Sequence, residues 1–249
     1  MTMRNVGFIY GIHPVQTLLN KATTDIVQVL VDRDRIDKRL RQLINLAEKC
    51  GITVEVCNKA TLKELVGEAR HQGVIAQCKL PQNKSENDLI TLLEQDDTVP
   101  LFLVLDQVQD PHNLGACLRS ADACGVRAVI APKDRAAGLT PTVFKVSCGA
   151  ALMVPYIQVT NLARTLRLMR EYGIQIVGTS DASTESIFDV DLKPATAIVL
   201  GTEAKGMRRL TAAECDQQVR LPMQGVVESL NVSVAAGVCL YELVRQRCL

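Results

Sequence analysis

Apolar residues recur along the chain with two different periods, which together predict alternating strands and helices. In the first third, strand-like alternation or short apolar runs occur at residues 26–31, 52–57 and 73–80. Helical spacing occurs between them, at 38–51 and 61–69, and the first of these segments ends at Gly51, as helices often do. The alternation predicts a compact α/β domain over residues 1–80.

The same alternation continues with longer apolar runs over residues 99–249. Continuous apolar segments, which are typical of strands buried on both faces of a parallel sheet, occur at 101–106, 128–132, 174–180 and 196–201. Helical spacing separates some of them, at 113–125 and 162–173. The pattern predicts a second α/β domain, a doubly wound parallel sheet with helices on both faces.

The segment 81–98 between these regions is polar and contains only one short helical patch. Pro81 opens it, and Pro100 lies just beyond its end. Such a composition is typical of a linker. We therefore expect a small domain at 1–80, a linker at 81–98 and a larger domain at 99–249.

Composition excludes several classes of protein. Hydrophobic residues make up 47% and charged residues 22% of the 249 residues, as in ordinary globular proteins, and no apolar run reaches the roughly 18 residues of a membrane span. The amino terminus has no signal-like apolar segment. The nine cysteines form no CxxC pair, and the three histidines are scattered. We expect a cytoplasmic protein with reduced cysteines, no metal and no membrane partner.

Charge is divided unevenly between the two domains. Residues 1–80 contain 12 Lys and Arg against 8 Asp and Glu, whereas residues 81–249 contain 16 against 19. This division suits a small domain that faces a polyanion, and it suits a random distribution of surface charge equally well. The densest basic cluster, at 33–41, is interleaved with aspartates, so a solvated helix start is an equal alternative.

Candidate chemistry gathers where predicted strands end. Loops rich in glycine, asparagine and acidic residues follow the apolar runs at 101–106 and 196–200, and a third such loop occupies 222–231. Because ligands bind at the carboxyl ends of parallel strands, these loops predict one composite pocket. The chain has no G-x-G-x-x-G, no complete P-loop and no G-x-S-x-G, which disfavours a dinucleotide site, an NTPase and a serine hydrolase.

Three motifs together resemble a known family. They are N-L-G-A-x-x-R-S-A-D-A-x-G at 113–125, G-T-E-A-K-G-M at 201–207 and L-P-M-x-G-x-V-E-S-L-N-V-S-V-A-A-G at 221–237. They are similar to the motifs of the SpoU (TrmH-like) branch of the SPOUT RNA ribose 2′-O-methyltransferases. The first domain resembles the L30e-like RNA-binding domain of many members, on YGIHPV at 10–15 and HQGVIAQ at 71–77.

The resemblance implies a fold, a cofactor and a partner. The fold would be an α/β sheet with a C-terminal trefoil knot, and the enzyme would be a homodimer. S-adenosyl-L-methionine would be held by residues of the second and third motifs: Gly201, Gly206, Leu221, Pro222, Met223, Ser229 and Leu230. The expected substrate is a guanosine ribose in the peptidyl-transferase centre of 23S rRNA. The alternatives are a tRNA ribose, or RNA binding without catalysis in ribosome assembly.

The resemblance also implies catalytic and RNA-binding residues. Arg119 would be the central catalytic residue, surrounded by Asn113, Glu203, Ser229 and Asn231. Because an arginine pKa exceeds about 12, we expect Arg119 to act as a fixed cation rather than a base. His112 is a weaker alternative base. The expected RNA-binding residues are Arg33, Arg35, Arg39, Arg41 and Arg119.

Overall fold

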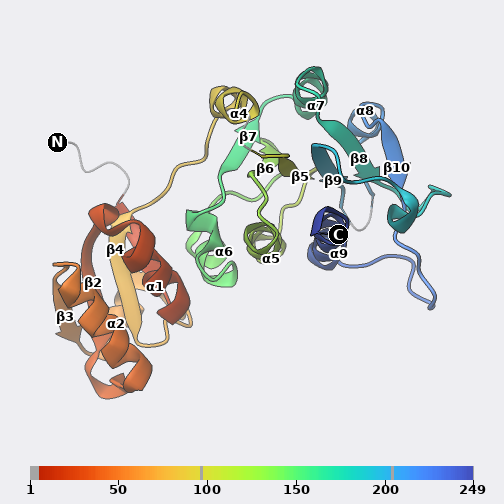
Figure 1. Cartoon of the computed structure of the whole chain (residues 1–249). Helices are drawn as coiled ribbons and strands as arrows, with labels where there is room; N and C mark the ends of the chain where they lie inside the picture. Colours follow the sequence, from red (N-terminus) through yellow and green to blue (C-terminus); the bar gives the residue numbers. More distant parts are fainter. Residues whose placement is uncertain (1–5, 96–97, 203–204, 249) are drawn as a thin grey trace. The chain divides into compact units, whose positions relative to one another are not determined.

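The computed structural model describes residues 6–95, 98–202 and 205–248. The chain divides into two compact units (Figure 1). Unit 1 consists of Met1–Gln82 together with Leu139–Met153, and unit 2 consists of Asn83–Gly138 together with Val154–Leu249.

Unit 1 is built on a four-stranded mixed sheet. Its elements are β1 (Val6–Tyr10), α1 (Ile12–Lys21), β2 (Ile26–Asp32), α2 (Lys38–Lys49), β3 (Val54–Cys57), α3 (Lys59–Val66), β4 (Val74–Lys79) and α6 (Pro141–Val146), with short 3₁₀ helices at Thr23–Asp25, Arg33–Arg35 and Ala150–Leu152. The strand order is β1-β4-β2-β3. Strand β4 is antiparallel to β1 and β2, whereas β2 and β3 are parallel. The alternation expected over residues 1–80 is therefore present.

The segment around α6 differs from expectation, because its contacts assign it to unit 1. In the sequence it lies within the region expected to form the larger domain. Val143 and Phe144 are buried, and α6 packs against β1 and α1. After α6 the backbone passes close to α1: Gly149 has φ +94°, and a Cβ there would lie 2.7 Å from Thr17 Oγ1. An amphipathic pattern predicts that a helix buries one face, but it does not name the neighbour.

Unit 2 contains a six-stranded sheet in which every neighbouring pair is parallel. Its elements are α4 (Glu86–Leu93), β5 (Leu101–Leu105), α5 (Pro111–Ala123), β6 (Ala128–Pro132), β7 (Tyr156–Val159), α7 (Leu162–Glu171), β8 (Gln175–Thr179), β9 (Thr196–Leu200), α8 (Arg209–Ala212), β10 (Gln217–Val219) and α9 (Val232–Cys248), with a 3₁₀ helix at Ile187–Asp189. The strand order is β10-β8-β9-β5-β6-β7. The predicted parallel sheet is confirmed.

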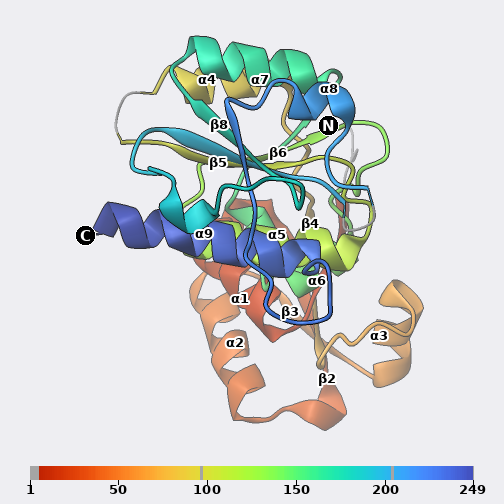
Figure 2. The same cartoon turned by 90° about the vertical axis from the view of Figure 1, so that its right-hand side faces the viewer.

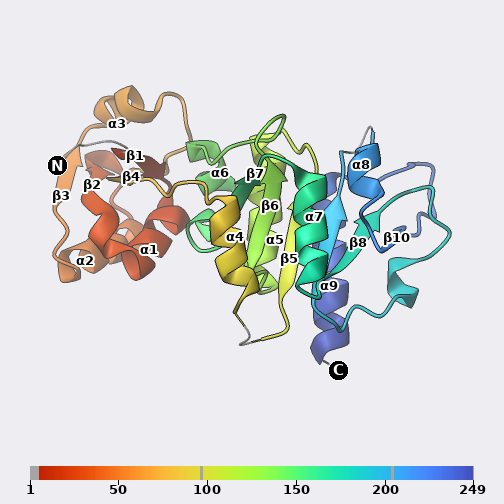
Figure 3. The same cartoon turned by 90° about the horizontal axis from the view of Figure 1, so that it is seen from above.

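Helices cover both faces of this sheet. Helices α4, α7 and α8 lie on one face, and α5 and α9 lie on the other (Figure 2). Figure 3 shows α4 and α7 across the strands. The side chains of Phe102, Ile130, Ile157 and Leu166 are completely buried in the core beneath α7. Strands buried on both faces explain the continuous apolar runs in the sequence.

Helix α4 lies within the segment expected to be a linker. A capping box between Ser85 and Asp88 starts the helix, and its Leu89 is completely buried in the core of unit 2. Much of that segment is therefore folded. The knot implied by the resemblance stays a prediction. None of the described helices is both long and apolar enough to cross a bilayer.

Candidate active site

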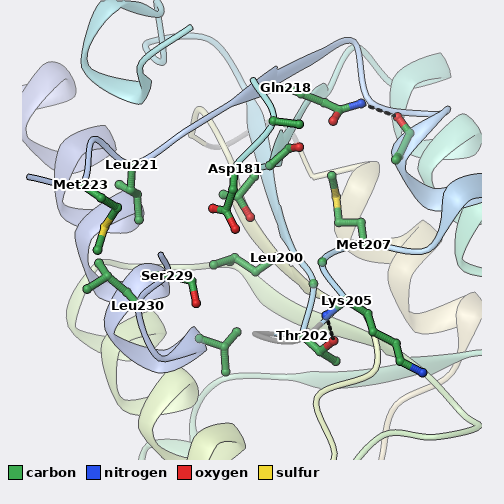
Figure 4. Close-up of a pocket in the computed structure, with 18 residues that line it drawn as sticks. Asp181, Leu200, Thr202, Lys205, Met207, Gln218, Leu221, Met223, Ser229 and Leu230 are labelled. Atoms are coloured by element: carbon green, nitrogen blue, oxygen red, sulfur yellow. Dashed lines mark hydrogen bonds between the residues drawn. The ribbon is translucent and has the colours of Figure 1, made fainter. Parts of the chain in front are cut away.

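A cavity of about 370 Å³ lies at the carboxyl ends of β8, β9 and β10, which are adjacent in the sheet. Its lining comes from the loops that follow these strands and from the start of α9 (Figure 4). Two of the three loops expected to form one composite pocket, the loop after 196–200 and the loop at 222–231, line this cavity in unit 2, whereas the loop after 101–106 contributes none of its lining residues. Four parts of the chain contribute to it: residues 179–182, residues 200–202 with 205–207, residues between 212 and 223, and residues between 229 and 235.

The loop after β9 closes tightly on itself. The Thr202 amide donates to the Gly206 carbonyl at 3.1 Å, and the Gly206 amide donates to the Thr202 carbonyl at 2.8 Å. A Cβ on Gly201 would overlap the carbonyl group of Gly206, and Gly206 itself has φ +62°. Both positions therefore require glycine, one for space and one for conformation. The result is backbone that reaches the edge of the cavity without side chains in the way.

A buried carboxylate anchors the end of this loop. Asp106 directly follows β5, and its side chain is 0% exposed. One carboxylate oxygen accepts a hydrogen bond from the Arg208 amide at 2.8 Å, and the other accepts from Arg208 Nε at 2.7 Å. Charge-assisted hydrogen bonds of this kind are among the stronger ones in proteins. The pair fastens the cavity-lining loop to the central strand of the sheet.

The cavity wall combines an apolar side with a few polar groups. Leu221, Met223 and Leu230 lie together on one side (Figure 4). The charged residues lining it, within the described part of the chain, are Asp181 and Lys205, which carry opposite signs. Apolar surfaces that can sandwich a base, backbone groups exposed by glycines and both signs of charge suit a nucleoside joined to an amino acid. S-adenosylmethionine is such a molecule.

Six of the seven residues expected to bind the cofactor line this cavity: Gly201, Gly206, Leu221, Met223, Ser229 and Leu230. Pro222, between two of them, is exposed and is not among the lining residues. Met207 both lines the cavity and packs against the core.

The expected catalytic residues are only partly brought together. Asn231 Nδ2 donates to Asn113 Oδ1 at 3.0 Å, which joins the starts of α9 and α5. Asn231 Oδ1 also accepts from the Ser233 amide at 3.0 Å and so caps α9. Ser229 lines the cavity nearby, but Arg119 is exposed further along α5 and does not line it. Glu203 lies outside the described residues.

Two other reactive side chains near these elements have ordinary structural surroundings. His112 is exposed in the first turn of α5, where its amide donates to the capping Asp110. Cys215 contacts Met207 at 4.0 Å between the two sulfur atoms. Burial, together with the negative charges of Asp216 and Asp106, raises the pKa of Cys215 to about 12, so it stays a thiol at neutral pH. Within the described residues, no cluster of His, Cys, Asp or Glu could hold a metal ion.

Sequence reasoning missed several cavity residues. Thr179, Ser180 and Asp181 follow β8, and Lys205 lies in the loop after β9. Their place directly after parallel strands was the signal available, and the loop after β8 carries few of the glycines and asparagines that mark the other loops. Asp106 was missed as well, because its partner Arg208 is 102 residues away.

Four of the five arginines expected to bind RNA are exposed in unit 1, and the fifth, Arg119, is exposed on α5 of unit 2. Arg33 and Arg35 form a 3₁₀ turn after β2, and Arg39 and Arg41 lie in the first turn of α2. Two of the aspartates interleaved with them have structural tasks, because their side chains accept backbone hydrogen bonds as helix caps. Within the described residues, neither of these two acids forms an ion pair with the arginines.

Comparisons with known proteins identify relatives over nearly the whole chain. Residues 100–241 match the model of the SpoU rRNA methylase family, and residues 8–84 match that of RNA 2′-O ribose methyltransferase substrate binding. The 23S rRNA (guanosine-2′-O-)-methyltransferase RlmB of Coxiella burnetii is 50% identical over 98% of both chains. The RlmB of Escherichia coli K12 is 51% identical over 96% of this chain and 98% of that protein.

Solved structures show the same architecture. An RNA 2′-O ribose methyltransferase matches with a TM-score of 0.81 and 29% identity, over 99% of this chain and 90% of that one. The SpoU methyltransferase AviRb from Streptomyces viridochromogenes, in complex with AdoMet, matches with a TM-score of 0.77 and 25% identity over 97% and 90%. The Aquifex aeolicus TrmH/SpoU tRNA modifying enzyme has a TM-score of 0.56 and 30% identity, and covers 65% of this chain and 83% of its own.

Proposed function

The chain belongs to the SpoU rRNA methylase family, and from this premise we propose that it transfers the methyl group of S-adenosylmethionine to the 2′-hydroxyl of a guanosine in 23S rRNA. The observation that carries the proposal is identity of 50% over 98% of both chains with an enzyme of that name. The peptidyl-transferase centre is the target we expect within that RNA.

The extent of the matches favours rRNA over tRNA. The rRNA-directed relatives align along nearly the full length, including the match to the substrate-binding model at 8–84. The tRNA modifying enzyme covers only 65% of this chain. Because ribosomal RNA is the substrate, we place the protein in the cytoplasm. A silent assembly factor is disfavoured, because the cavity and the Asn113–Asn231 pair are both formed.

The cavity residues contribute to this reaction in different ways. S-adenosylmethionine, when bound, supplies an activated methyl group. Gly201 and Gly206 expose backbone to it, and Leu221 and Leu230 provide the apolar walls for its base. Pro222, which lies between Leu221 and Met223, stays a predicted contact of the cofactor. Methyl transfer is an in-line displacement, so holding donor and hydroxyl in line contributes much of the rate.

The acceptor side relies on charge rather than on a conventional base. We assign Arg119 the role of a fixed cation that grips the neighbouring phosphate and stabilises the developing alkoxide. Asn113, Ser229 and Asn231 orient the ribose, and Glu203, which lies outside the described residues, stays a predicted partner of Arg119 or of the cofactor. Since Arg119 does not line the cavity of its own chain, a homodimer that supplies it from the second subunit completes the site. Exposed Val234 and Tyr241, seven residues apart on α9, offer an apolar stripe for that dimer.

Mapping ribose methylation in total RNA from cells with and without the protein tests the substrate. Loss of one methyl group at a guanosine of 23S rRNA is expected. Loss at a tRNA position would favour the alternative enzyme, and an unchanged map would favour the silent factor.

Replacing Arg119 by Ala tests the catalytic assignment in the purified enzyme. Turnover should fall by at least 10²-fold, because a preorganised charge at the reacting oxygen contributes that much or more. Affinity for S-adenosylmethionine, measured by calorimetry, should change less than about twofold. Asp122→Ala, on the exposed side of the same helix, is the matched control. Retained turnover in the Arg119 variant would refute its role.

A further inference from the structure

Three strands end and one begins at the same edge of the unit 1 sheet. Tyr10 at the end of β1 pairs with Ile75, Val31 near the end of β2 pairs with Val74, and Asp32 pairs with Cys57 at the end of β3. Arg35 and Lys59 follow β2 and β3, Arg70 precedes β4, and Lys145 belongs to α6 and contacts the turn at this edge through Gln72. We call Arg35, Lys59, Arg70 and Lys145, together with the turn at 70–73, the basic edge.

Glycines at this edge make room for the basic side chains. Gly73 has φ +81°, and a Cβ there would lie 3.1 Å from Cδ of Arg35. Gly11 has φ +98°, and a Cβ there would lie 3.1 Å from Cδ of Lys145. A larger residue at position 73 would press against the side chain of Arg35, and one at position 11 would press against that of Lys145. The side chains of Arg35 and Lys145 therefore lie directly against the backbone of the edge.

The turn at 70–73 holds Lys145 with a neutral group. Gln72 has φ +58°, and its Oε1 accepts hydrogen bonds from the Ile12 amide at 3.3 Å and from Lys145 Nζ. The same oxygen thus serves the first turn of α1 and the lysine. A glutamine fixes the position of the ammonium group without cancelling its charge.

Within the described residues, acidic side chains do not balance the cationic side chains of the basic edge. Among the described residues, no carboxylate lies within ion-pair distance of Arg35, Arg70 or Lys145. Asp32 is nearby, but its side chain is used as a cap for the Arg33–Arg35 turn, and Asp34 is the exposed acid of that turn. Positive charge therefore remains in excess.

The crowding of positive charge is visible in two neighbouring groups. Burial lowers the pKa of Lys145, and the charges of Arg35 and Arg70 lower it further, with Cys148 acting in the opposite direction. Burial likewise lowers the pKa of His71, where Arg35, Lys59 and Lys145 add to the effect and Asp32 opposes it. Convergence of like charges destabilises a fold unless something of opposite sign binds there.

We propose that Arg35, Arg70 and Lys145 form a phosphate-binding surface for the RNA substrate. This inference rests on the proposed function, which makes RNA the partner. It places the main contact at the sheet edge rather than along α2, and it adds Arg70 and Lys145 to the residues expected from the sequence. Phosphate contacts fix register and orientation without reading sequence.

The opposite edge of the same sheet provides a matched control. Helix α1 ends at Lys21, α2 ends at Lys49 and β4 ends at Lys79, where it pairs with the first residue of β1. All three lysines are exposed. Neutralising them removes three positive charges from unit 1, as many as neutralising Arg35, Arg70 and Lys145 removes.

The experiment compares full-length variants for binding to 23S rRNA transcribed in vitro, titrated between about 50 and 300 mM KCl. The variant R35Q/R70Q/K145Q should bind about 10²-fold more weakly near 100 mM, and its slope of log affinity against log salt should be shallower by about two, since each phosphate contact contributes about 0.7–0.9. The control K21Q/K49Q/K79Q should stay within about twofold at an unchanged slope. The charge-preserving R35K/R70K/K145R should regain most of the slope.

Three outcomes would decide against the surface. Equal losses in both neutralised triples would mean that only net charge matters, and an unchanged slope in R35Q/R70Q/K145Q would mean that these residues touch no phosphate. A loss that R35K/R70K/K145R does not restore would mean that these residues act through the packing of unit 1 rather than through their charge, and thermal unfolding of each variant reports that packing separately. Failure of the wild-type protein to bind or methylate 23S rRNA would instead reject the proposed function.

Discussion

The buried carboxylate of Asp106 offers a sharp test of how the cofactor loop is held. It accepts hydrogen bonds from the amide and from Nε of Arg208, so Asp106→Asn keeps one acceptor oxygen and places an amide NH₂ against the other donor. One charge-assisted hydrogen bond is then lost, worth about 1.5–3 kcal/mol. The side chain of Arg208 is 42% exposed and can turn to water, so the loss should not exceed that range. Urea denaturation at pH 7 measures it.

The same substitution should weaken cofactor binding. Residues 201, 202 and 205–207 line the cavity just before Arg208, and once this anchor is loosened, binding must order them again. If about 1.4 kcal/mol of the lost stability reappears as this ordering cost, affinity for S-adenosylmethionine falls about tenfold. Isothermal calorimetry of the purified variant gives that number directly.

Asp216 provides the control, because it makes the same kind of contact away from the cavity. Its carboxylate accepts from the Ile176 amide at 2.8 Å near the start of β8 and pairs with Arg170 at 3.4 Å. Asp216→Asn should lower the free energy of unfolding while leaving cofactor affinity within about twofold. If both variants lose affinity equally, or if Asp106→Asn loses stability alone, the anchoring argument is refuted.

Two further predictions concern a glycine and a buried acid. Gly201→Ala should abolish detectable S-adenosylmethionine binding in calorimetry, because its Cβ would overlap the Gly206 carbonyl; wild-type affinity would show that the loop can open without cost. Hydrogen bonds from Arg245 and then Gln246 hold the pKa of Glu242 below its ordinary value against the effect of burial. Glu242 thus stabilises the fold above the unfolded pKa of about 4.3, and this contribution is lost as pH falls through the lower folded pKa. Glu242→Gln should unfold at a lower temperature at pH 7 and show less acid dependence between pH 5 and 3 in thermal scans; an unchanged acid limb would contradict this.

The sheet of unit 2 was predictable because its strands are buried on both faces. Segments such as 101–105 and 196–200 can satisfy that environment only with unbroken apolar runs, so the sequence carries the signal locally. Part of the cavity followed from the run at 196–200, because ligand-binding loops follow the carboxyl ends of parallel strands, whereas the loop after 101–105 does not line it. The local sequence pattern is therefore sufficient to predict an element when all of its residues are buried to the same degree.

The remaining features depend on contacts that local pattern does not encode. Asp106 and Arg208 are 102 residues apart, and Lys145 and Gln72 are 73 apart. The sequence of the helix at Pro141–Val146 indicates that one face is buried, but it does not indicate which of the two units that face packs against. Motif resemblance found Asn113 and Asn231 without geometry, yet it could not show that they bond to each other.

Burial separates two aspartates that the sequence presents alike. Asp106 comes directly after β5 and Asp181 comes two residues after β8, so both lie at strand ends beside the cavity. The carboxylate of Asp106 is fully buried, and each of its oxygens accepts a hydrogen bond from Arg208, so a ligand cannot reach it. Asp181 is exposed at the cavity, and no described residue donates a hydrogen bond to its carboxylate. Of the two, Asp106 therefore shapes the site, whereas Asp181 has the free charge that a cationic part of a bound cofactor can meet.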